Sequence, residues 1–338
     1  MGRTIRIANA DRVNILNIGL MAGSCAVALF IPFQLFLFAY AVLGPAHYLT
    51  EISWLEKRRF FTRGRHDFWL LGGLAVPVFL AAALSSGSLD RQQPYQAATW
   101  TFLALGCALV LVTTARTIPR ILGIAAFGAL ALVLFDDAGF PAVLLGLFVP
   151  TLVHVYLFTG FFIIYGALKE RSRSGYAAFA VFLLCPAACL LLDPGKFPPG
   201  NWVAIPYWNN FSLLNLTILG IDLPHNSFDA GQAWQKVFSS GPGIVAMRFI
   251  AFAYTYHYLN WFSKTSVIGW HEVSWKRLLS IAAIWLASVG LFLHDYSLGF
   301  KFLFCLSLLH VYLEFPLNHI SIMGTLREVR SLRISQAR

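Results

Sequence analysis

The chain has 338 residues, of which 58% are hydrophobic and only 12% are charged, and its mean hydropathy is +0.68. Soluble proteins carry about 25% charged residues, so this chain has too little polar surface to cover a water-exposed particle of its size. The composition excludes a soluble globular protein and predicts a multi-spanning membrane protein. The net charge of +10 does not indicate nucleic-acid binding, because the basic residues stand in short clusters between long apolar runs.

Ten apolar segments are long enough to cross a bilayer, which takes about twenty mostly apolar residues in a helix. In chain order they are 13–31, 33–54, 68–84, 97–115, 119–136, 142–167, 175–192, 243–263, 276–293 and 298–322. Only Ile31-Pro32 separates the first two, so one long tilted helix is the alternative there. The sequence predicts an all-α membrane bundle of about ten transmembrane helices, forming one integral-membrane domain over residues 1–338.

The distribution of basic residues predicts the orientation of these segments. With the N-terminus in the cytoplasm, all but five of the 25 Lys and Arg residues fall on the cytoplasmic side; the five are Arg91, Lys196, Lys236, Arg248 and Lys301. Cytoplasmic loops of membrane proteins are enriched in Lys and Arg. The asymmetry therefore predicts an even number of spans and places both termini in the cytoplasm.

The longest interruption between apolar segments covers residues 193–242 and is rich in proline and aromatic residues. Trp and Tyr favour the headgroup region of a bilayer. We expect this segment to form an interfacial cap on the outer face, with a short re-entrant helix around Phe211–Ile221. Such a cap is a structural lid, a gate, or a docking surface for a membrane-protein partner.

Few ionisable residues fall well inside the predicted spans, and each is a candidate for function because an unpartnered charge in hydrocarbon is costly. The candidates are two glutamates and four histidines, in the second, sixth, eighth and tenth segments: His47, Glu51, His154, His257, His310 and Glu314. His319 follows His310 by nine residues, which puts it on the opposite face of a regular helix.

Each of the two glutamates follows a histidine by four residues, at Glu51 and Glu314, so both members of each pair share one helix face. Imidazole and carboxylate together are ligands of non-haem iron, manganese or zinc, and helical bundles build such sites from facing helices. The six candidates are therefore predicted to form a shared metal or haem site. For any single histidine, a hydrogen bond between helices is the alternative.

The sequence Gly44-Pro45-Ala46-His47, followed by isolated histidines in later spans, resembles the Brp/Blh family of membrane-embedded carotene dioxygenases. In that family four histidines hold a non-haem iron, and the enzyme cleaves the central double bond of β-carotene to give retinal. The resemblance covers only the His-bearing segments and implies that His47 is an iron ligand. The chain departs from the pattern at Trp261, which stands four residues after His257 where the family has a second histidine. Glu51 and Glu314 are not part of the family's set of four histidines.

Two classes of function agree with these residues. One is a membrane oxidoreductase, an oxygenase in which non-haem iron or another divalent metal acts on a lipid-soluble polyene or isoprenoid and Glu51 and Glu314 act as catalytic or metal-binding carboxylates. The other is a protein that binds haem b or translocates ions or protons, and a structural subunit of a membrane complex is a third alternative. Two carboxylates beside four imidazoles favour the non-haem metal, because haem needs only axial ligands.

Overall fold

The computed structural model describes residues 2–84, 92–134, 140–193, 199–221, 229–264, 269 and 273–336. Within these ranges the regular secondary structure is entirely helical, which confirms the predicted all-α class. Arg91, Lys196 and parts of the 193–242 segment lie outside the described residues.

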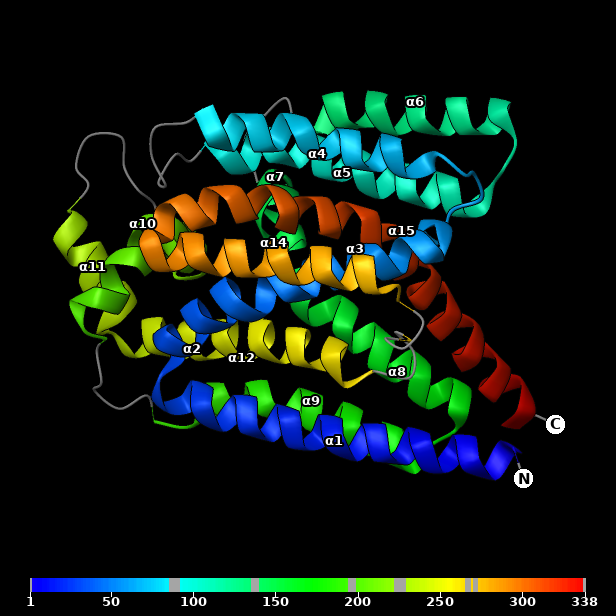
Figure 1. Cartoon of the computed structure of the whole chain (residues 1–338), viewed down its shortest axis with the longest axis horizontal. Coiled ribbons are helices and arrows are strands. Elements are labelled where there is room, and N and C mark those ends of the chain that lie inside the picture. The colour runs from blue at the N-terminus through cyan, green and yellow to red at the C-terminus, as the bar shows by residue number, and fades with distance from the viewer. Residues whose placement is uncertain are drawn as a thin grey trace. The chain divides into compact units, whose positions relative to one another are not determined.

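All ten predicted segments fall on helices (Figure 1). The first five correspond to α1 (Gly2–Phe30), then α2 (Pro32–Phe38), the π-helix η1 (Ala39–Leu43) and α3 (Gly44–Lys57) together, then α4 (Asp67–Leu84), α5 (Gln92–Thr113) and α6 (Thr117–Leu134). The last five correspond to α7 (Phe140–Val143), the π-helix η3 (Leu144–Phe158) and α8 (Thr159–Glu170) together, then α9 (Arg173–Leu191), α12 (Gly241–Ser263), α14 (Trp275–His294) and α15 (Tyr296–Gln336). A 3-10 turn, η2 (Arg59–Phe61), follows α3.

Among the described residues, seven helices are long and apolar enough to cross a membrane, and the bent pair of α11 (Ala230–Phe238) and α12 makes an eighth if it counts as one span. Residues 13–54 form two helices, because the backbone of Ile31 leaves the helical region (φ −134°, ψ 57°) and Pro32 starts a new helix. Helices α4 and α5 contain shorter apolar stretches, Asp67–Ala81 and Ala97–Thr113. The total of ten spans and the cytoplasmic termini stay predictions.

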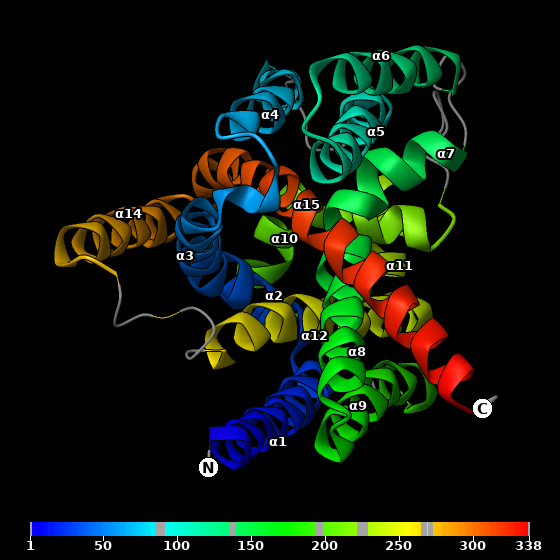
Figure 2. The same cartoon turned by 90° about the vertical axis from the view of Figure 1, so that its right-hand side faces the viewer.

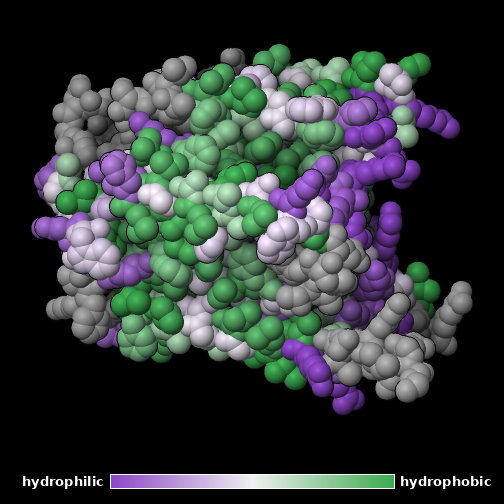
Figure 3. All heavy atoms as spheres, viewed as in Figure 1, coloured by the Kyte–Doolittle hydropathy of each residue, from purple (hydrophilic) through white to green (hydrophobic). Residues whose placement is uncertain are grey.

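Hydrophobic side chains cover the outward faces of several helices. On α6 and α14, Leu132 and Leu293 are 73% and 84% exposed. Figure 3 shows hydrophobic side chains along the middle of the helices and hydrophilic ones gathered near helix ends. Apolar surface on this scale is unfavourable in water, so the helices suit a multi-pass protein whose outward faces contact lipid.

The chain divides into two compact units, each described here by itself. The first unit comprises the described residues of Met1–His47 and Arg173–Phe300, and the second those of Tyr48–Ser86, Asp90–Ser172 and Lys301–Arg338. Helices α3 and α15 contribute residues to both units.

In the first unit, α1 packs against α9 and α12. Close to the middle of α1, Asn14 Nδ2 donates to the Ser174 hydroxyl at the start of α9 (2.9 Å). At the other end, the buried Arg248 of α12 donates to the carbonyl oxygens of Leu29 (3.0 Å) and Leu192 (3.1 Å), where α1 and α9 end. Helices α1 and α9 are therefore parallel, and one guanidinium satisfies terminal carbonyls of both.

The described residues of the 193–242 segment hold α10 (Asn201–Ile218) and α11, where a short re-entrant helix around Phe211–Ile221 was predicted. Helix α10 begins earlier than predicted and continues through Pro206. Its Tyr207 and Phe211 pack edge-on against Phe33 and Phe36 of α2, with ring centroids 5.1 and 4.8 Å apart. Part of the predicted cap thus belongs to the hydrophobic core of the first unit.

In the second unit, α4, α5 and α6 are neighbours (Figure 2). Two glycines bring α5 and α6 close together: a Cβ on Gly106 would lie 2.3 Å from the Phe127 ring, and one on Gly123 would lie 2.8 Å from Val110. Arg120 at the start of α6 makes a two-pronged ion pair with Asp67 at the start of α4 (2.9 and 3.0 Å). Helices α4 and α6 therefore begin at the same end of this unit.

We expect Arg248→Met to destabilise the protein by about 3 kcal/mol, because the carbonyls of Leu29, Leu192 and Asp193 lose their buried donor. Thermal unfolding in detergent measures the effect as a clear drop in the midpoint temperature. Arg327→Met, which removes an exposed guanidinium, is the control and should leave the midpoint unchanged. Equal midpoints for both variants would contradict the capping role of Arg248.

Candidate metal centre

Helix α15 places His310 and Glu314 one turn apart on a single face. Their side chains approach to 3.8 Å between His310 Nε2 and Glu314 Oε2, and both residues are only 1% exposed. The predicted His-x-x-x-Glu geometry is thus present in the folded chain, in an interior where a charged group needs a partner.

The π-helix η3 adds His154 to this pair. His154 Nε2 lies 3.2 Å from His310 Nε2 and 3.4 Å from Glu314 Oε2, and the residue is 1% exposed. A π-helix bonds i to i+5 rather than i to i+4, and short π-helical turns are frequent at functional sites. Pro150 lies inside η3, where it cannot donate a backbone hydrogen bond. The irregular helix geometry therefore occurs at the segment that carries the histidine.

Helix α3 supplies a second carboxylate and an aromatic wall. Glu51 is 2% exposed, and its Oε2 lies 3.8 Å from His310 Nε2. Three residues earlier on the same helix, the Tyr48 ring stacks on the His310 imidazole, with centroids 4.5 Å apart and planes 29° from parallel. Glu51 and Tyr48 therefore both contact the His310 imidazole, one at Nε2 and the other at the ring face.

A backbone hydrogen bond fixes the tautomer of His310. Its Nδ1 lies 2.8 Å from the carbonyl oxygen of Ser307 and donates to it, since a carbonyl can only accept. In the neutral ring the lone pair then lies on Nε2, the atom that faces His154 and Glu314. Histidines that bind metals commonly use their other nitrogen in this way.

The ligand atoms of His154, His310 and Glu314 all lie within 4.8 Å of one another. An ion bound to nitrogen and oxygen at about 2.0–2.2 Å holds adjacent ligand atoms about 3.0–3.5 Å apart. The observed separations of 3.2, 3.4 and 3.8 Å need only small side-chain movements to reach that geometry. These residues fit a divalent metal ion in both spacing and chemistry.

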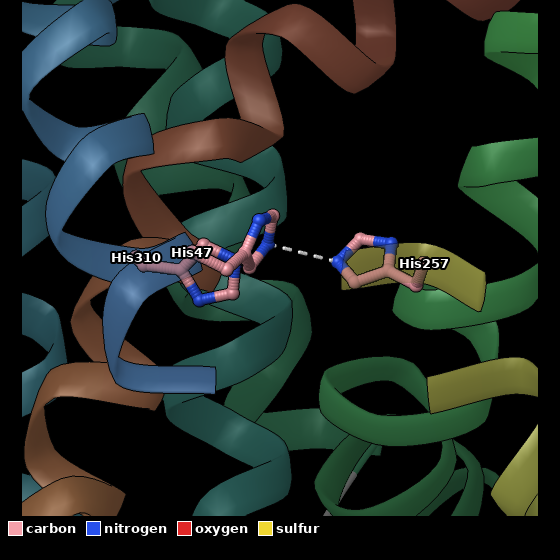
Figure 4. A group of neighbouring side chains, drawn as sticks. All are labelled: His47, His257 and His310. Atoms are coloured by element: carbon pink, nitrogen blue, oxygen red, sulfur yellow. Dashed lines mark hydrogen bonds between the residues drawn. The ribbon is translucent and has the colours of Figure 1, made fainter. Parts of the chain in front are cut away.

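A histidine pair lies within the first unit. His257 of α12 and His47 of α3 approach to 3.1 Å between their Nε2 atoms and are 6% and 1% exposed (Figure 4). Trp261, one turn after His257, lies with its ring edge-on to His47 at 5.8 Å between centroids. The position at which the Brp/Blh pattern would have a second histidine is thus filled by an indole that packs on His47.

The structure therefore brings together His154, His310, Glu314 and Glu51 in the second unit and pairs His47 with His257 in the first. A single ion shared by all six residues stays a prediction. His319 is separate from these groups, because its Nε2 is bonded to the backbone oxygen of Leu105 (2.9 Å).

Tyr48 and Ser307 also contribute to the site, and sequence reasoning did not assign them a role. The Ser307 contact uses a backbone oxygen, which any residue type provides, and the stacking of Tyr48 depends on how α3 and α15 pack. The chain matches no protein-family model, no curated protein and no solved structure. The Brp/Blh resemblance accordingly stays a prediction, and the function is argued from the geometry of the site.

We expect His310→Ala to abolish stoichiometric metal binding, because its Nε2 lies within 3.8 Å of a ligand atom of each other candidate ligand of this cluster. Elemental analysis of the purified protein measures the effect. His319→Ala is the matched control: it removes a mostly buried histidine of the same helix that bonds a backbone carbonyl instead. Metal retained in His310→Ala, or lost equally in both variants, would rule out the proposed ligand.

Proposed function

We propose that the protein is a membrane-embedded, metal-dependent oxidoreductase in which His154, His310, Glu314 and Glu51 bind non-haem iron. It would act as an oxygenase on a lipid-soluble substrate such as a polyene or another isoprenoid. The observation that carries this proposal is the convergence of two buried carboxylates and a second imidazole on a single atom, His310 Nε2.

The charge of this cluster supports a bound cation. Both Glu51 Oε2 and Glu314 Oε2 lie 3.8 Å from the same nitrogen, in residues that are 1–2% exposed. Two carboxylates held so close together repel each other, and their desolvation cost in an apolar interior is high. A divalent metal ion offsets both the repulsion and the desolvation cost, whereas neutral imidazoles alone cannot.

The ligand set favours iron among the divalent metals. Two histidines and one carboxylate with open coordination positions are the ligand pattern of non-haem iron oxygenases. When bound, such an iron supplies one-electron redox chemistry and activation of dioxygen. Glu51, as the second carboxylate, can ligate the ion directly or accept a hydrogen bond from a group bound to it.

A haem site fits the second unit less well. A haem with two histidine ligands needs the macrocycle between the two imidazoles. The Nε2 atoms of His154 and His310 are 3.2 Å apart, closer than two axial nitrogens on opposite faces of a haem iron. The geometry therefore supports a small ion in preference to haem b.

The surroundings of the site favour a substrate that dissolves in lipid. All four candidate ligands are at most 2% exposed, and the outward face of α6, in the same unit, carries exposed apolar side chains such as Leu132. A low-dielectric interior holds an apolar molecule and keeps water away from reactive species. A polyene or isoprenoid satisfies both conditions.

Proton translocation is a second candidate, and the His47–His257 contact favours it. Two imidazoles 3.1 Å apart can pass a proton along a hydrogen bond, and histidine chains relay protons in membrane pumps. Proton uptake by liposomes containing metal-free protein would support this candidate over the oxygenase.

We expect the purified protein to contain about one iron per chain and to show no Soret absorption band. Elemental analysis and an absorption spectrum of the same sample provide the test. A strong Soret band would show that the protein binds haem instead of non-haem iron. Protein that binds no metal even after anaerobic incubation with ferrous iron would overturn the proposed function.

We expect Glu51→Gln to weaken iron binding about 10- to 100-fold, because the amide keeps the shape of the side chain and removes the charge beside His310. Competition with a chelator measures the affinity. Glu56→Gln changes an exposed carboxylate on the same helix and should bind iron like the unaltered protein. An unchanged iron affinity in Glu51→Gln would show that Glu51 does not take part in binding the ion.

A further inference from the structure

Beyond the metal ligands, α15 carries a continuous stripe of buried polar side chains. The stripe consists of residues spaced by three or four positions, at 1%, 1%, 2%, 2% and 8% exposure: His310, Glu314, Asn318, Ser321 and Thr325. Residues at this spacing lie on one face of a helix. The polar face thus continues from the candidate metal centre along the helix.

Two members of the stripe are satisfied by their own helix. The Ser321 hydroxyl donates to the carbonyl of Leu317 (3.0 Å), and the Thr325 hydroxyl donates to that of Ser321 (2.9 Å). Asn318 differs from them. Neither its Nδ2 nor its Oδ1 has a hydrogen-bond partner among the described residues, although the side chain is 98% buried.

An unsatisfied buried amide lowers the stability of the protein. Leaving a donor or an acceptor unpaired costs about 1–3 kcal/mol, and hydrocarbon offers no water to replace the missing partner. An apolar residue of similar size, such as leucine, would avoid this cost. The choice of asparagine at this position therefore points to a partner that the described residues do not provide.

We propose that Asn318 binds the hydroxyl group of the substrate, and that the substrate is accordingly an isoprenoid alcohol. This inference rests on the proposed function and specifies its substrate class. An amide offers both an acceptor oxygen and a donor nitrogen, and a hydroxyl is the small group that can pair with both. A carbonyl group would use only Nδ2 and leave Oδ1 unpaired.

The position of Asn318 would also orient the substrate. On a helix, four residues correspond to a rise of about 6 Å, so Asn318 lies about one turn beyond Glu314, with Pro316 between them. A hydroxyl held there directs one end of the substrate away from the metal ligands and leaves the apolar chain to extend past them. Asn318 is therefore a specificity residue, not a metal ligand.

Binding of two C15 probes that differ by one hydroxyl, farnesol and α-farnesene, tests the proposal in detergent-solubilised protein. We expect the unaltered protein to bind farnesol about tenfold more tightly than α-farnesene, the net effect of the hydroxyl's hydrogen bonds to the Asn318 amide. Asn318→Leu should bind both probes alike. Ser321→Ala is the matched control on the same stripe and should keep the preference, because that hydroxyl is bonded to its own helix.

Stability gives a second readout that a structural role for Asn318 would not produce. Without added ligand, Asn318→Leu should raise the midpoint of thermal unfolding by about 2 °C, because it removes an unsatisfied group. Farnesol should then raise the midpoint of the unaltered protein by more than it raises that of Asn318→Leu, which loses only the hydroxyl contact. A lower midpoint in Asn318→Leu without ligand would show that a bound water already pairs with the amide, and would overturn the proposal.

Iron content separates this inference from the function on which it rests. Asn318→Leu should retain the iron of the unaltered protein, since the residue is not a ligand. If both proteins bind iron but the unaltered protein binds farnesol and α-farnesene equally well, the proposed hydroxyl site is wrong. The proposed oxidoreductase function is then unaffected. Absence of iron from both proteins would overturn the oxidoreductase, whatever the probes do.

Discussion

The cost of burying carboxylates in an apolar bundle is the constraint on which this structure depends. Glu51 and Glu314 are almost completely removed from solvent, and both approach His310 Nε2 at 3.8 Å. Such a pair is stable only with a compensating positive charge or a shared proton. His154, supplied by η3, and the Ser307 carbonyl, which fixes the tautomer of His310, complete an arrangement that suits a metal cation.

The need of buried polar groups for hydrogen-bond partners also explains contacts in other parts of the chain. Arg248 is a buried cation, and it donates to carbonyls at the ends of two helices that would otherwise lack partners. Ser321 and Thr325 satisfy themselves on their own helix. Asn318 of the α15 stripe neither caps a helix nor bonds to its own helix among the described residues. For this reason we propose that it binds the substrate. Among the described buried polar residues, Arg248 thus caps helices, Ser321 and Thr325 bond within their own helix, and the histidine–glutamate cluster suits a cation.

Composition and spacing predicted much of this fold. Runs of about twenty apolar residues correspond to the helices, and the spacing of His310 and Glu314 placed both on one face, as the structure confirms. The sequence did not reveal that Pro206 lies inside α10, because proline both begins and interrupts helices. It also did not reveal which histidines pair, since the choice of His154 with His310 and of His47 with His257 depends on packing between distant segments. The π-helical geometry of η1 and η3 has no comparable signal in residue spacing.

The proposed function requires a metal ion between His154, His310 and Glu314. An anomalous difference map collected at the iron absorption edge, from crystals of the purified protein, tests for this ion. We expect a peak within about 2.2 Å of the two Nε2 atoms and of a Glu314 carboxylate oxygen. Iron located elsewhere in the protein, or no anomalous peak together with a direct hydrogen bond between His154 and His310, would contradict it.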